Sequence, residues 1–208
     1  MNRLHYSHFE EDEKLVENKR RGQKKRGRKK AGKGKELNDE WFWKIVEKAK
    51  EKADGSREKR PKALKSLLKN LDPDQIVEFY KIYMKKIRQA YSWDLWGAAY
   101  LIQGGCGDDG FEYWRDFLIS EGKEIYMGAL KAPDTLASLD GLDDVDLEGY
   151  RYAIHDAFEE LTGEEMPMDV LEDEIHESSE PDGEEWDEED LAERFPKLAK
   201  KYGSFGAS

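Results

Sequence analysis

The sequence predicts an all-α fold: an irregular single-domain helical bundle, preceded by a disordered basic arm and followed by an acidic region. Apolar residues recur at spacings of three and four along the middle of the chain, and no segment shows the alternation of a strand. Five of the six tryptophans lie between Trp41 and Leu139. We therefore expect residues 1–37 to form the arm, 38–163 the helical core, and 164–208 an acidic linker with a closing segment that docks on the core.

The first three helices are predicted from their starts. Asn38 and Asp39 are favourable N-cap residues, and apolar residues follow them at helical spacing to about Ala53. Pro61 is typical of a first helical turn and predicts a second helix with leucines on one face. Asp72-Pro73 predicts the start of a third helix that runs to about Tyr91.

The segment from Trp93 to Gln103 is apolar on nearly every side, which predicts a central, buried helix. The glycines from Gly104 to Gly107 end it, and Asp108 or Asp109 is expected to cap the next helix, whose inner face carries Phe111, Trp114, Phe117 and Leu118. The remaining elements are expected at Glu124 to Lys131, Pro133 to Leu139, Asp146 to Leu161, and Trp186 to Tyr202 with an interruption at Pro196.

The net charge of −12 hides two opposed blocks. Residues 140–190 hold 23 acids and a single arginine. The segment 19–35 holds eleven basic residues and no acid: Lys19, Arg20, Arg21, Lys24, Lys25, Arg26, Arg28, Lys29, Lys30, Lys33 and Lys35. Interleaved glycines and the lack of any apolar residue other than Ala31 predict that this arm is disordered.

The basic arm has three interpretations. It binds phosphates of nucleic acid or an anionic membrane, it is a solubilising tail, or it pairs with the acidic half of its own chain. No aromatic residue is interleaved in it, so any nucleic-acid binding should be non-specific and salt-sensitive.

The cellular location can be inferred from the number of cysteines and from the length of the apolar segments. Cys106 is the only cysteine, so no intramolecular disulfide can form, which favours a reducing compartment. The N-terminal residues show no apolar h-region, and the longest apolar run, Leu95 to Ile102, is far shorter than the ~20 residues of a membrane span. We expect a cytoplasmic protein without a membrane span.

The central motif resembles a known family. The stretch from Tyr91 to Ile102 (YSWDLWGAAYLI), followed by Gly104 to Phe111 (GGCGDDGF), resembles the bacterial family named domain of unknown function 4240. Phe42-Trp43, Pro133-Asp134 and Arg194 to Leu198 add to the resemblance, which covers roughly Leu37 to Tyr202. The resemblance implies a shared fold and carries no catalytic residue with it.

The same motif is the candidate site. Glycines from Gly104 to Gly110 allow close approach of a ligand, and aromatic rings at helical spacing could form its walls. The candidate ligand or partner surface comprises Trp93, Asp94, Trp96, Tyr100, Gln103, Cys106, Asp108, Asp109, Trp114 and Arg115. Helix capping and core packing explain the same residues, and this second interpretation is favoured.

Signatures of catalysis and of metal or cofactor binding are missing. The sequence has no zinc, phosphate-loop or serine-hydrolase motif, and we predict no metal, no cofactor and no catalytic residue. Cys106 with His155 as a base is a minor possibility.

The leading hypothesis is a non-enzymatic interaction module that binds a protein partner, possibly a basic one, through its acidic half or through the motif surface. The alternatives are a nucleic-acid-associated protein tethered by the arm and an enzyme that uses the Gly104–Gly110 turn.

Overall fold

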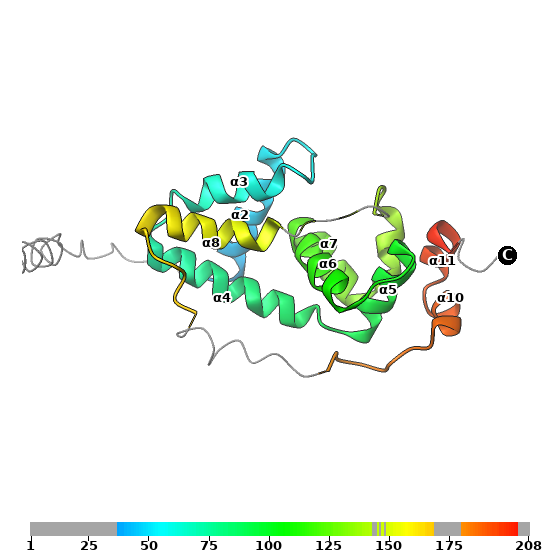
Figure 1. Cartoon of the computed structure of the whole chain (residues 1–208). Coiled ribbons are helices and arrows are strands. Elements are labelled where there is room, and N and C mark those ends of the chain that lie inside the picture. Colours follow the sequence, from blue (N-terminus) through cyan, green and yellow to red (C-terminus); the bar gives the residue numbers. More distant parts are fainter. Residues whose placement is uncertain (1–36, 143–144, 146, 148, 169–179, 204–208) are drawn as a thin grey trace, which may run out of the picture. The chain divides into compact units, whose positions relative to one another are not determined.

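The computed structural model describes residues 37–142, 145, 147, 149–168 and 180–203, and the regular elements of these residues are all helices (Figure 1). Its elements are α2 (Asp39–Lys52), α3 (Arg60–Leu68), α4 (Pro73–Gln89), α5 (Trp93–Gln103), α6 (Asp108–Ser120), α7 (Lys123–Lys131), η1 (Pro133–Ser138), α8 (Gly149–Thr162), η2 (Glu188–Asp190), α10 (Leu191–Arg194) and α11 (Pro196–Tyr202). No strand occurs among the described residues. The predicted all-α fold is confirmed. The predicted arm and the acidic residues 169–179 lie outside the described residues.

Local capping explains where several helices begin and end. The Asn38 side chain accepts hydrogen bonds from the backbone of Glu40 and Trp41, both at 3.1 Å, and so caps α2. The Ser92 hydroxyl accepts from the backbone of Leu95 at 3.3 Å at the start of α5. Gly104 ends α5 in the left-handed region, with φ of 70°, a conformation that favours glycine.

The start of α6 differs from the prediction. Gly107 is the N-cap residue, in extended conformation, and Asp108 and Asp109 lie in the first turn of the helix without capping it. Their negative charges still face the positive end of the helix dipole, so the sequence signal was an acidic first turn and not a side-chain cap.

Two groups of helices pack around a shared core. In the first group, α3 runs beside α8, α2 packs on α3, and α4 packs on α8 (Figure 1). In the second group, α5 lies against η1, α10 and α11. Helix α6 contacts members of both groups. Large side chains without solvent exposure fill the interior: Trp114, Tyr83, Tyr126, Tyr150, Phe42, Phe79, Phe111, Phe117, Leu64, Leu68, Ile76 and Ile87.

A search of the described residues finds no helix with both the length and the apolar character needed to cross a bilayer.

Candidate functional site

The aromatic residues of the predicted site stack on one another. The rings of Trp93 and Trp96 stack with centroids 5.4 Å apart, Trp96 stacks on Phe111 at 5.0 Å, and Phe111 stacks on Trp114 at 6.0 Å. The indole nitrogen of Trp96 donates to the carbonyl of Cys106 at 2.8 Å, which ties the end of the glycine-rich turn to α5. These aromatic rings therefore pack on one another, where the sequence analysis considered them as possible walls of a ligand site.

Two residues of the predicted surface belong to the core, which corrects their placement. Trp114 has no exposed surface, and Arg115 is only 6% exposed. The Arg115 guanidinium lies over the ring of Tyr91 at 4.8 Å and donates to the carbonyl of Ile87 at 3.3 Å. Helical spacing alone does not reveal that a cation within an apolar face is buried against aromatic rings.

The other polar residues of the motif do not converge on one point. Asp94 forms an ion pair with Arg194 at 2.6 Å, and the Gln103 side-chain amide donates to the carbonyl of Val145 at 3.4 Å. Asp108 and Asp109 are exposed. Burial raises the pKa of the Cys106 thiol to about 11, so the thiol is not activated as a nucleophile.

The closing segment packs directly on α5. We call residues 180–203 the strap. Its side chains Leu191, Phe195 and Leu198 are buried, as predicted for a docked segment. The Trp186 ring meets Trp93 edge-on with centroids 6.2 Å apart and also contacts Tyr100 at 5.2 Å.

Hydrogen bonds fix both ends of the strap. The backbone of Trp93 donates to the carbonyl of Asp182 at 2.9 Å, and Asp182 donates back to Tyr91 at 3.0 Å. The Trp186 indole donates to the carbonyl of Trp93 at 2.8 Å. At the other end, Asp134 of η1 accepts from the first amides of α11, those of Lys197 and Leu198, both at 2.9 Å.

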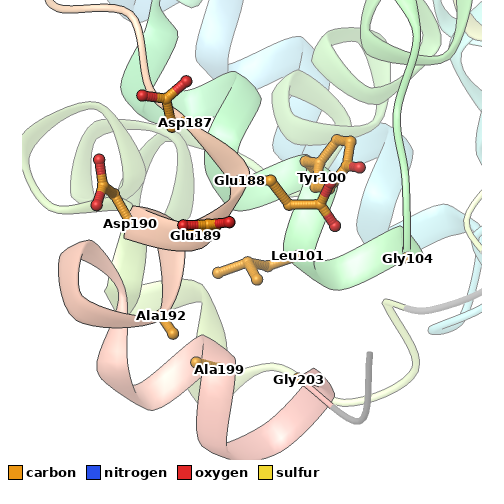
Figure 2. Close-up of a pocket in the computed structure, with 10 residues that line it drawn as sticks. All are labelled: Tyr100, Leu101, Gly104, Asp187, Glu188, Glu189, Asp190, Ala192, Ala199 and Gly203. Atoms are coloured by element: carbon orange, nitrogen blue, oxygen red, sulfur yellow. The ribbon is translucent and has the colours of Figure 1, made fainter. Parts of the chain in front are cut away.

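A groove of about 820 Å³ opens between the strap and α5 (Figure 2). We call it the strap groove. The apolar part of its lining comes from both sides, with Leu101 on α5 and two alanines on the strap. Its lining residues are Tyr100, Leu101, Gly104, Asp187, Glu188, Glu189, Asp190, Ala192, Ala199 and Gly203.

The strap groove is acidic. Its lining holds four consecutive carboxylates, all on exposed residues, and contains no lysine or arginine. Glu188 lies beside Tyr100 in Figure 2, and a hydrogen bond between these side chains raises the pKa of the Tyr100 hydroxyl. One carboxylate is therefore anchored to α5. In the part of the chain that is described, no group of three or more His, Cys, Asp or Glu side chains is arranged to hold a metal ion.

Two buried polar clusters lie away from the groove. In the first, Asp116 accepts a hydrogen bond from the Tyr83 hydroxyl at 2.6 Å and from Arg151 at 3.1 Å, while Arg151 also pairs with Glu112. Burial lowers the pKa of nearby His155, whose ring meets Tyr80 edge-on.

The second cluster surrounds Glu121, which is 5% exposed. It pairs with Arg60 at 2.9 Å, with Arg57 at 2.8 Å and with Lys50 at 3.3 Å. Burial raises the pKa of Glu121, but the hydrogen bonds from Arg60 and Arg57 outweigh it, so the net shift is downward. Both clusters join helices that are distant in sequence.

Sequence reasoning placed Asp187 to Asp190 in the acidic region and Tyr100 in the candidate surface, but it did not bring them together. The available signal was the position of these acids directly after Trp186, the first anchor of the predicted docked segment. Only the fold shows that this anchor lies against Tyr100.

Comparisons with known proteins give one result. No curated protein and no solved structure matches the chain. A family match covers residues 37–160, from the start of α2 nearly to the end of α8, and includes the whole aromatic motif. The residues 194–198 that add to the resemblance lie beyond the matched range. The chain belongs to the family described as protein of unknown function (DUF4240).

Proposed function

We propose that this protein is a non-enzymatic interaction module that binds a basic segment of a partner protein in the strap groove. The observation that carries the proposal is the groove itself: a concave surface with apolar residues in its lining and four carboxylates beside them. Its volume of about 820 Å³ falls in the range of ~300–1,000 Å³ that is usual for ligand sites.

The lining suggests how a segment binds. Leu101, Ala192 and Ala199 offer apolar contact for one side chain of a partner. Exposed carboxylates at Asp187, Glu189 and Asp190 are available to Lys or Arg on either side of that anchor. The partner segment is therefore expected to carry basic residues around an apolar one.

The charge of the chain supports the same partner. Residues 140–190 hold 23 acids against one arginine, and the strap groove lies at the end of this block. A concentrated negative field accelerates encounter with a basic partner and weakens as salt screens it. Association is expected to be fast and salt-sensitive.

A direct test is the binding of a fluorescein-labelled peptide of lysine and glycine with a single central leucine, measured by fluorescence anisotropy on the full chain. The variant Asp187→Asn, Glu188→Gln, Glu189→Gln, Asp190→Asn should bind roughly 3–150-fold more weakly, because the three carboxylates that are available to the partner each form an exposed ion pair that contributes about 0.2–1 kcal/mol.

The matched control removes the same number of charges from exposed positions outside the groove: Glu58→Gln, Glu124→Gln, Glu159→Gln and Glu165→Gln. It should retain most of the affinity. Equal weakening in both variants would show that net charge alone attracts the peptide, and absence of binding at low salt would refute the proposal.

A further inference from the structure

The strap groove is assembled from two separate parts of the chain. Tyr100, Leu101 and Gly104 come from α5 and its C-cap, and the other seven lining residues come from the strap (Figure 2). The groove therefore exists only while the strap lies on α5. A residue that is needed for the strap to dock on α5 is therefore needed for the groove to form, even when that residue does not line the groove.

Gly97 occupies the contact between the two parts. A Cβ atom at this position would lie 2.8 Å from a methyl carbon of Leu191, 3.0 Å from the ring of Phe195 and 3.1 Å from the indole nitrogen of Trp186. All three neighbours belong to the strap. The Gly97 backbone lies within the regular helix α5, so it is space for the strap, and not backbone conformation, that requires glycine here.

The electrostatics link docking to binding. In the docked strap, Glu188 is held beside α5 by its hydrogen bond to Tyr100, and the neighbouring carboxylates of Asp187, Glu189 and Asp190 repel it and one another. A cationic segment in the groove removes this repulsion and contacts both α5 and the strap. Because such a ligand binds the docked state and finds no groove in the undocked one, it stabilises docking by mass action.

We infer that Gly97 is a positioning residue for the strap groove, and that docking of the strap and binding of a basic segment form one coupled equilibrium. The coupling rests on the proposed function, whereas the role of Gly97 in docking does not.

The test uses hydrogen–deuterium exchange with mass spectrometry on the full chain, which reports strap docking and core folding separately. In Gly97→Ala the amides of residues 180–203 should exchange faster, and in Gly97→Val faster still, because the three atoms nearest to the added Cβ all belong to the strap. Amides of α3 and α8 serve as the internal reference and should stay protected, since these helices do not include the contact.

Binding of the lysine–leucine peptide should weaken in the same order, at least tenfold for Gly97→Val. In the wild-type chain, the peptide at about 100 times its Kd should slow strap exchange by up to roughly 100-fold. Leu191→Val removes the methyl carbon nearest to position 97, so Gly97→Ala with Leu191→Val should be less perturbed than the sum of the two single variants.

Each negative result contradicts a different part of the proposal. Unchanged strap exchange in Gly97→Val, with α3 and α8 protected, overturns the role of Gly97. A released strap with undiminished peptide binding overturns the coupling. A released strap in a chain whose wild type never binds the peptide refutes the proposed function and leaves the positioning role of Gly97 supported.

Discussion

Asp116 shows how a buried carboxyl contributes to the dependence of folding stability on pH. Burial raises its pKa from the ordinary 3.8 to about 6, although Arg151 and the Tyr83 hydroxyl act in the opposite direction. Between these two values the folded state keeps a proton that the unfolded state has lost. Asp116 therefore makes the protein less stable as pH rises from about 4 to about 6.

Replacing Asp116 by Asn should remove this contribution. A shift of about two units corresponds to roughly 3 kcal/mol between the ends of the window. Urea denaturation of wild type and Asp116→Asn at both ends of the window measures the difference in slope. Tyr83→Phe deletes a hydrogen bond that lowers the pKa of Asp116, so it should extend the slope to higher pH. Parallel curves for all three proteins would contradict this account.

Individual residues were predicted unevenly from the sequence. Apolar anchors such as Phe111 and Phe117 on α6 were predicted correctly, because helical spacing reports burial directly. Arg115 and Asp116 were not recognised as buried, since their environment depends on Tyr91, between α4 and α5, and on Arg151 from α8. Such contacts between distant segments leave no periodic signal in the chain.

At the scale of elements, helix starts were the most readable feature. Asn38 and Pro61 lie where α2 and α3 begin, because capping and first-turn preferences depend only on neighbouring residues. The start of α6 was wrong by one residue, since two acids after a glycine-rich turn suit both a cap and a first turn. Local chemistry therefore predicts elements well and their ends less well.

The cap of α2 gives an element-scale prediction. Asn38→Ala should lower the free energy of unfolding by about 1 kcal/mol, because two backbone amides lose their acceptor. Asn38→Asp keeps an acceptor oxygen and should remain close to wild type. Chemical denaturation monitored by circular dichroism compares the three proteins, and an alanine variant as stable as the aspartate variant would exclude a capping role.

At the scale of the whole molecule, separation of charge is the dominant property. The segment 19–35 carries eleven positive charges, and the rest of the chain has 24 basic residues against 47 acids. The two blocks suit partners of opposite charge, so binding of nucleic acid through the arm is a proposal independent of the strap groove. Composition predicts these blocks, but only tertiary contact between α5 and the strap forms the groove.

Deletion of residues 19–35 tests the arm. If the arm binds phosphates, the full chain should bind an arbitrary DNA duplex at low salt and the deletion variant should not. About six phosphate contacts would lower the affinity roughly 10³-fold between about 50 and 200 mM salt. Electrophoretic mobility shifts across that range measure the effect. A full chain that ignores the duplex at low salt would eliminate this proposal.

The bridge between Ser92 and Asp182 has a consequence for synthesis of the protein. The ribosome completes α5 about a hundred residues before it completes the strap, an interval of roughly 5–20 s at ordinary elongation rates. During this interval Trp186 and the rest of the strap have not yet been synthesised. The aromatic surface around Trp93 and Tyr100 is then exposed to other newly synthesised chains. A chain truncated before residue 180 would leave this aromatic surface uncovered, so we expect it to aggregate more readily than the full chain.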